Sequence, residues 1–180
     1  MKYVTIWTLA LMSVVNLAAA GEVADGVSVE RHQAVVQVKG IVCSFCAYGT
    51  EKNLAKLPFL DAAQYGNGVL MDIHTDRVTL AVQPDQRIDV AGVYNAILKG
   101  GYDPVTIDLG LHGEVTKDGD RYLIACPEND QVFEVTGEAV AELVGRGAVD
   151  IHVQADAEAM ISASPNQPVR VVLVADGDAS

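Results

Sequence analysis

The sequence is poor in basic residues. Twelve lysines and arginines stand against 24 aspartates and glutamates, so the formal net charge of the 180 residues is −12 at pH 7. Nucleic-acid binding depends on lysine and arginine contacts with phosphates, and anionic membrane surfaces repel an acidic protein. The composition therefore excludes a nucleic-acid-binding function, and we expect no nucleic acid among the partners.

Cysteine is also scarce. Three cysteines are too few for the disulfide framework of a small secreted protein, which normally has four or more in paired spacings. Cys43 and Cys46 are separated by two residues, whereas Cys126 stands alone. One close pair and one distant thiol are typical of a site rather than of a scaffold.

The motifs of common enzymes are absent from the sequence. It contains no recognisable Ser/His/Asp set, no carboxylate pair in a cleft pattern and no phosphate-binding glycine loop. We therefore predict that the protein is not an enzyme.

Long apolar runs are missing except at the N-terminus. Lys2 is a short basic start, residues 4–15 are mostly apolar, and Ala18 and Ala20 stand at positions −3 and −1 of a cleavage site before Gly21. This pattern predicts a signal peptide over residues 1–20, cut after Ala20, and a retained anchor is the alternative. We expect a periplasmic or secreted protein that reaches a disulfide-forming compartment and does not insert into a membrane after cleavage.

The first half of the mature chain follows a regular order of elements. After a flexible leader at residues 21–30, residues 31–108 predict a strand, a helix, two strands, a helix and a strand. The first strand is expected at residues 34–38, and the first helix has its apolar face over residues 47–57. This order predicts a ferredoxin-like βαββαβ domain.

The second half is richer in short strands. Residues 109–175 contain five short β-patterns and one short helical segment at 138–144, and residues 176–180 form a tail. Such a pattern predicts a small, partly open barrel of the OB type. The predicted fold class is therefore α+β: a ferredoxin-like domain followed by a small, mostly β, OB-like domain.

The pair Cys43 and Cys46 lies where the first strand leads into the first helix. Cys46 is expected at the helix start, where free N–H groups and the helix dipole favour a thiolate, and Cys43 in the loop before it. Two thiolates suit a soft ion of low coordination number, such as Cu(I) or Hg(II), whereas Zn(II) requires two further ligands. A catalytic dithiol/disulfide pair and a structural disulfide are the alternatives.

Four stretches of the sequence share a resemblance with a known family. They are Gly-Ile-Val-Cys-Ser-Phe-Cys at 40–46, Leu-Pro-Phe-Leu at 57–60, Val-Thr-Leu at 78–80 and Gly-Gly-Tyr-Asp-Pro at 100–104. Together they resemble the heavy-metal-associated domain family of bacterial copper chaperones, periplasmic mercury-binding proteins and metal-ATPase repeats. The resemblance covers residues 31–108, under half of the chain, and the C-terminal β-domain is additional to it.

The resemblance implies a metal-transfer function for this half of the chain. Members of the family hold one soft ion between two cysteines, here Cys43 and Cys46, and pass it to a partner by thiolate exchange. Tyr102 would stand in the loop that covers the site. The sequence departs from the family at Val42, where a threonine is usual, and in a longer segment around residues 65–68.

The remaining cysteine and the four histidines are predicted not to bind metal. We predict that Cys126 is a buried small residue, and a third metal ligand is the alternative. His32 and His74 are expected to be solvated, and His112 and His152 alternate with apolar residues and are predicted to face the surface.

The sequence as a whole predicts an exported protein that binds one soft metal ion. Cu(I) is the expected ion, Hg(II) the next, and Zn(II) less suited. The expected partner is a protein that donates or accepts the metal. Two other functions stay open: thiol–disulfide exchange through the same cysteines, and a non-catalytic adaptor that acts through the C-terminal β-domain.

Overall fold

The computed structural model describes residues 29–41 and 44–174. The predicted signal peptide, most of the leader, Cys43 and the whole predicted tail at residues 176–180 lie outside the described residues. The side chains of residues 44–46 lie outside them as well.

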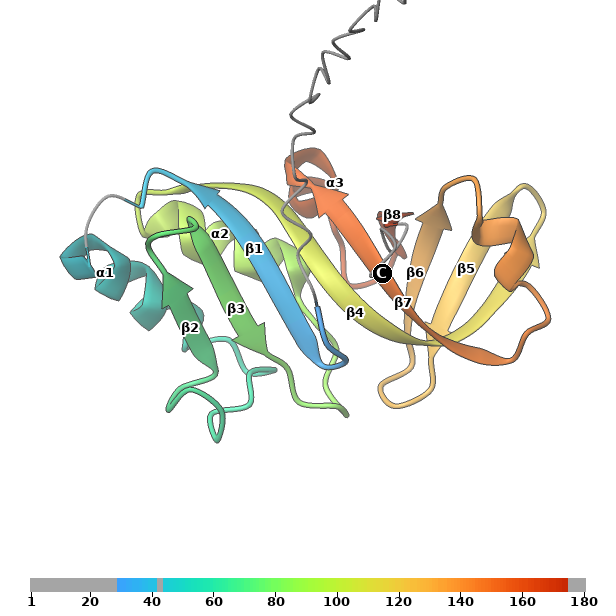
Figure 1. Ribbon diagram of the computed structural model, residues 1–180, viewed down its shortest axis with the longest axis horizontal. Helices are drawn as coiled ribbons and strands as arrows, with labels where there is room; N and C mark the ends of the chain where they lie inside the picture. Colours follow the sequence, from blue (N-terminus) through green and yellow to red (C-terminus); the bar gives the residue numbers. More distant parts are fainter. Residues whose placement is uncertain (1–28, 42–43, 175–180) are drawn as a thin grey trace, which may run out of the picture.

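The described chain contains strands in both halves and short helices between them (Figure 1). The order of elements in the first half, strand–helix–strand–strand–helix–strand, confirms the predicted order. The elements are β1 Gln33–Lys39, α1 Ser44–Leu54, β2 Val69–Asp72, β3 Arg77–Ala81, α2 Val90–Lys99, β4 Asp103–Asp118, β5 Arg121–Cys126, β6 Gln131–Thr136, the 3-10 helix η1 Val140–Leu143, β7 Ala148–Asp156, α3 Ala157–Ser162 and β8 Val169–Leu173.

The short helix α3 is the element that the sequence patterns did not predict. Asp156 caps it, because its carboxylate accepts a hydrogen bond from the amide of Ala159 at 2.8 Å. Met160 is the buried residue of this single turn and a half. An N-cap aspartate followed by alanines and a glutamate was the available signal.

All eight strands belong to one sheet, in the order β2-β3-β1-β4-β5-β6-β8-β7. An additional pairing joins β4 to β7 and closes β4, β5, β6, β8 and β7 into a five-stranded barrel. Strand β4 therefore has three neighbours: β1 from Asp103 to Leu109, β7 from Thr106 to Glu114, and β5 from Glu114 to Asp118. Figure 1 shows this long strand running from the first half into the barrel.

The predicted fold class is wrong. A ferredoxin-like βαββαβ domain followed by a small OB-like barrel is not what the chain forms; the protein is mostly β, with a closed five-stranded barrel and only short helices. The 16-residue strand β4 continues through residues 108 and 109, where the sequence patterns suggested a change of unit. The expected partly open barrel is closed, because β7 pairs with β4 over nine residues.

Two glycines allow β4 to serve both parts of the sheet. A Cβ atom at Gly110 would collide with the carbonyl oxygen of Glu30, which crosses the strand at this point. A Cβ atom at Gly113 would collide with the carbonyl oxygen of Ala125 in β5. Glycine within a strand marks such close backbone approaches. The absence of a side chain at Gly110 and Gly113 therefore allows β4 to run past these two carbonyl groups without a clash.

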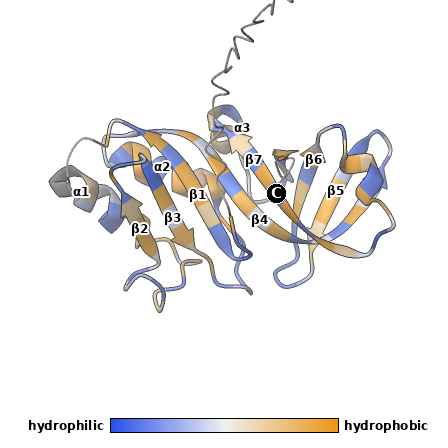
Figure 2. Ribbon diagram, viewed as in Figure 1, coloured by the Kyte–Doolittle hydropathy of each residue, from blue (hydrophilic) through white to orange (hydrophobic). Residues whose placement is uncertain are grey.

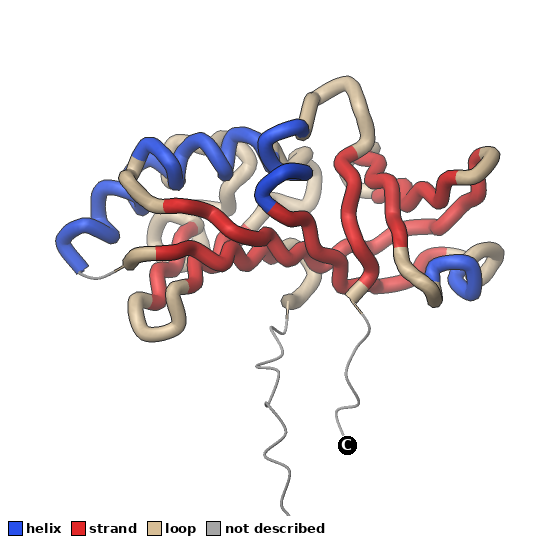
Figure 3. The backbone as a smooth tube through the Cα atoms, turned by 90° about the horizontal axis from the view of Figure 1, so that it is seen from above, coloured by secondary structure: helices blue, strands red, loops and turns tan. Residues whose placement is uncertain are grey.

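Helices α1 and α2 lie on one face of the sheet formed by β2, β3, β1 and β4 (Figure 3). The apolar face predicted over residues 47–57 is confirmed as far as Leu54: Ala47, Thr50 and Leu54 are buried, whereas α1 ends at Leu54 and Leu57 beyond it is partly buried. Gly49 lies on the exposed side of this helix, and a Cβ atom there would meet no neighbouring part of the chain within 4 Å. Gly49 therefore does not serve a close approach of another backbone.

One apolar cluster extends from the helices through the sheet into the barrel. Hydrophobic residues follow the strands in both halves, as Figure 2 shows. In the barrel, Phe133 lies opposite Ile124 on one side and Val169 on the other. Both halves thus share a continuous core, with these fully buried side chains among its largest: Phe59, Phe133, Leu54, Leu80, Ile97, Ile107, Leu109, Ile124 and Met160.

Among the described residues, none of the helices has both the length and the apolar composition to cross a membrane.

Candidate functional site

The predicted site residues belong to one end of the sheet, where β1 leads into α1 and α2 leads into β4. Cys43 lies outside the described residues. Cys46 is the third residue of α1, and its side chain is not among those described. Tyr102 immediately precedes β4 and is buried, with 6% of its surface exposed. The register of β1 and β4 pairs Lys39 with Asp103, so Tyr102 and the chain toward Cys43 lie side by side.

Two glycines with left-handed backbone angles shape this end of the sheet. Gly40 and Gly101 both have φ of +90°, a conformation that side chains disfavour. A Cβ atom at residue 40 would lie 3.9 Å from Cδ1 of Tyr102, so the aromatic ring packs against the backbone there. The amide of Tyr102 donates to the carbonyl of Ile97 at 3.4 Å. The ring is thus held beside a residue three positions before Cys43.

The end of α2 fits closely against α1. A Cβ atom at Gly100 would collide with the hydroxyl of Thr50, which is fully buried and follows Cys46 by four residues in α1. The amide of Gly100 donates to the carbonyl of Ile97 at 2.9 Å and ends the helix. Because glycine has no side chain, the end of α2 lies directly on the middle of α1, at Thr50. This contact between Gly100 and Thr50 fixes the turn that carries Tyr102 against α1, the helix that contains Cys46.

The donor atoms of the predicted ligands Cys43 and Cys46 are both sulfur, which suits a soft metal ion. Two cysteine sulfurs are soft ligands, and the first turn of an α-helix has free N–H groups that favour thiolates. The described part of the chain contains no group of three or more His, Cys, Asp or Glu residues that could hold a metal ion. The ligand pair Cys43 and Cys46 stays a prediction.

Cys126 ends β5, in the barrel. It is a free thiol with 7% of its surface exposed, which confirms the predicted burial. Burial, and then the nearby negative charge of Glu128, raise the pKa of Cys126 to about 11. Since the thiolate is the nucleophile and the metal ligand, Cys126 is poorly suited to either role at neutral pH.

Alkylation of the fully reduced protein tests this difference. Because the pKa of Cys126 rises from 9.0 to about 11, its thiolate fraction at pH 7.5 falls about 100-fold, and burial restricts access further. We expect iodoacetamide to modify Cys126 at least 100-fold more slowly than Cys43 and Cys46, as followed by mass spectrometry of the peptides. Equal labelling rates for all three cysteines would contradict this assignment.

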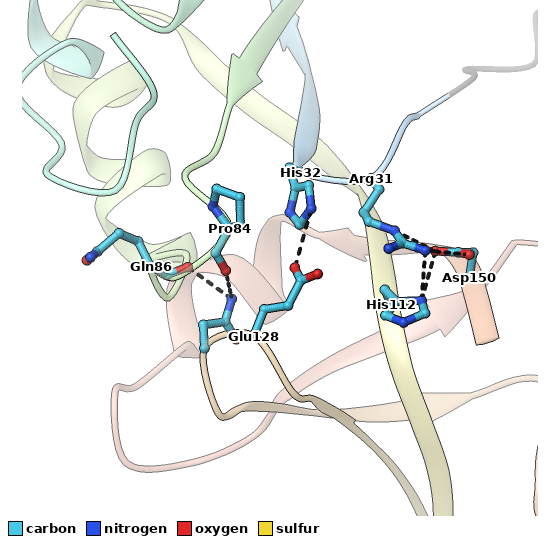
Figure 4. Close-up of polar contacts among 8 residues, drawn as sticks. Arg31, His32, Pro84, Gln86, His112, Glu128 and Asp150 are labelled. Carbon is cyan, nitrogen blue, oxygen red and sulfur yellow. Dashed lines mark hydrogen bonds and ion pairs between the residues drawn. The ribbon is translucent and has the colours of Figure 1, made fainter. Parts of the chain in front are cut away.

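A cluster of polar side chains lies around a small crevice between the first half of the chain and the barrel, and Figure 4 shows these side chains. His32, which has φ of +61°, approaches Glu128 with Nε2 3.3 Å from Oε2. Both side chains are partly exposed and line a small cavity of about 50 Å³ together with Cys126. The sequence did not predict this cluster, because His32 and Glu128 are 96 residues apart along the chain.

A neighbouring group in the same crevice fastens the start of the described chain to the barrel. Arg31 donates from Nε to Oδ1 of Asp150 at 2.9 Å and from Nη2 to Oδ2 at 2.8 Å. Nδ1 of His112 lies 3.0 Å from Nη2 of Arg31 and 3.1 Å from Oδ1 of Asp150. Burial alone would raise the pKa of Asp150, but the hydrogen bond and charge of Arg31, with His112, lower it below its ordinary value. The carboxylate is therefore ionised at neutral pH and holds Arg31.

The prediction that His152 faces the surface is wrong. Its side chain is only 13% exposed, and its Nε2 lies 2.8 Å from Oδ1 of Asp108, which also accepts a hydrogen bond from Gln154 at 3.0 Å. Strand alternation placed His152 on the outer face of β7 as predicted. The side chain is nevertheless mostly covered, because it lies against Asp108, which is itself buried.

The other histidines are closer to expectation. His74 lies in the exposed turn between β2 and β3, and His32 is partly exposed. His112 is 23% exposed and contacts two charged side chains, so it is less solvated than a free surface residue.

Comparisons of this chain with protein-family models, with curated proteins and with solved structures find no match.

Proposed function

We propose that this protein binds one soft metal ion, Cu(I) or Hg(II), through Cys43 and Cys46 and passes it to a partner protein by thiolate exchange. The single observation that carries the proposal is the Cys-x-x-Cys pair, whose second member is the third residue of α1. The buried Tyr102 packed on Gly40 supports it, because it gives the chain before the pair an apolar, water-excluding neighbour.

The chemistry of the pair favours a labile ion. Two thiolates satisfy an ion content with two ligands, and open positions allow an incoming thiolate of a partner to attack. A transfer partner is therefore a protein with its own soft ligands that donates or accepts the metal. The signal-like residues 1–20 support export, so we propose that binding takes place in the periplasm or outside the cell.

Thiol–disulfide exchange is the second candidate function. The Cys-x-x-Cys pair at the start of α1 and the signal-like residues 1–20 are compatible with it as well. A cysteine in the first turn of a helix with a partner three residues earlier is also the arrangement of dithiol oxidoreductases. An exported protein reaches an environment in which such a pair becomes oxidised. The two functions differ in whether the reduced pair retains a metal ion.

One experiment separates these functions. Native mass spectrometry of the reduced protein, lacking residues 1–20, is carried out with one equivalent of Cu(I), Hg(II) or Zn(II), and the reduction potential of the Cys43–Cys46 pair is measured beside it. We expect a one-to-one adduct with Cu(I) and Hg(II) and little retention of Zn(II). The absence of any adduct, together with an oxidising potential and disulfide reductase activity, would refute metal binding and support exchange.

A further inference from the structure

The barrel touches the first half of the chain at the start of α2. The turn at residues 127–130, between β5 and β6, lies against the loop at residues 83–89 that precedes this helix. The side-chain amide of Gln131 accepts from the amide of Ile88 at 2.8 Å and donates to the carbonyl of Ile88 at 2.9 Å. This two-point contact resembles the bonding between neighbouring strands, although one partner is a side chain.

Two further side chains complete this contact from opposite sides. Arg87 donates from Nε to the carbonyl of Asn129 at 3.0 Å and from Nη2 to the carbonyl of Asp130 at 2.8 Å. Asn129 donates in return to the carbonyl of Gln86 at 3.0 Å. We call the set of Arg87, Asn129 and Gln131 the α2 clamp. Each member bonds to backbone, so the clamp fixes where the chain runs.

The clamp acts directly before the first turn of α2. Ile88 precedes Asp89, whose carboxylate caps the helix by accepting from the amide of Gly92 at 2.8 Å. At the other end, Gly100 lies on Thr50 of α1, and Tyr102 packs on Gly40. The ten residues of α2 therefore connect the barrel turn to the end of the sheet that carries the cysteine pair.

From these contacts we infer that the barrel positions Tyr102, the predicted cover of the metal site, through α2: the α2 clamp fixes the start of the helix, and its far end holds Tyr102 against Gly40. The consequence for metal release rests on the proposed function, but the position of Tyr102 can be measured without metal. Arg87, Asn129 and Gln131 are positioning residues, since their hydrogen bonds go to the backbone of residues 86, 88, 129 and 130. The barrel would thus help to position Tyr102, although the two are far apart in the sequence.

The test compares the double variant Arg87→Ala/Gln131→Ala with the wild type. The control is Arg170→Ala, which removes an exposed barrel arginine whose Nε lies 3.3 Å from Oε1 of Glu134. Native-state hydrogen exchange is followed by mass spectrometry in peptides that cover residues 97–104. We expect exchange of the amides of residues 100–102 to be about tenfold faster in the double variant and unchanged in the control. Exchange that increases only at residues 83–89 and 127–131 would overturn the inference.

Metal release gives the second readout. With Cu(I) bound, we expect release to a chelating competitor to be about tenfold faster in the double variant than in the control. Faster exchange at residues 100–102 without any metal binding by the wild type would refute the proposed function and leave the positioning role intact. Normal metal binding with unchanged exchange and release would refute the positioning role alone. Urea unfolding of each variant identifies global destabilisation, which would raise exchange throughout the chain rather than at residues 100–102.

Discussion

Replacing Cys43 or Cys46 with serine is expected to lower the affinity for Cu(I) at least 1,000-fold. Each substitution removes one of the two thiolates, and a hydroxyl is a hard, neutral donor that does not replace a soft thiolate for this ion. The measurement is a competition titration of the reduced protein against a chromophoric Cu(I) chelator. A variant that retained the affinity of the wild type would show that the metal is held elsewhere.

Cys126→Ser is the matched control for this titration. Cys126 is buried, and the raised pKa of its thiol keeps it protonated at neutral pH, so its replacement should leave the Cu(I) affinity within twofold of the wild type. A comparable loss on changing Cys126 would bring the third cysteine into the site and contradict the two-ligand proposal. Urea unfolding shows whether the buried hydroxyl has destabilised the fold, separately from metal binding.

Replacing Gly113 with valine is expected to destabilise the protein by about 3 kcal/mol or to prevent folding. The first added carbon collides with the carbonyl oxygen of Ala125 and lies 3.0 Å from Cγ1 of Ile124. Both neighbours are fixed, one by the ladder between β4 and β5 and the other as a fully buried core residue. The clash can therefore be relieved only if β4 and β5 move apart at this point of the barrel. Equilibrium unfolding in urea, followed by circular dichroism, measures the loss.

Gly49→Ala is expected to stabilise the protein in the same unfolding assay. Gly49 lies on the exposed side of α1, and an added Cβ meets no atom within 4 Å. Because alanine favours helix over glycine, we expect the free energy of unfolding to rise by about 1 kcal/mol. A loss of stability at Gly49, or tolerance of valine at Gly113, would contradict the placement of these two glycines.

The local pattern of the sequence determined most of the secondary structure. The sequence predicted a first strand at residues 34–38, which lies within β1, and the apolar face of α1 from residue 47 onward, of which Ala47, Thr50 and Leu54 are buried. These features depend on neighbours within a few residues, so they can be inferred without knowing the fold. The Cys-x-x-Cys pair at the start of α1 belongs to the same class.

The tertiary structure decided how these elements combine. The sequence predicts a change of unit after residue 108, yet β4 continues through this point, and Gly110 leaves the space that the carbonyl of Glu30 occupies. His152, whose strand position alone predicts exposure, lies against the buried Asp108. Closure of the barrel depends on the pairing of β7 with β4, and its contact with α2 depends on Gln131 and Ile88, 43 residues apart. Such pairings are set by which backbone groups meet in space, and no short stretch of sequence contains that information. The sequence by itself determined most of the elements and the cysteine pair, whereas only the tertiary structure joined both halves into one sheet and one core.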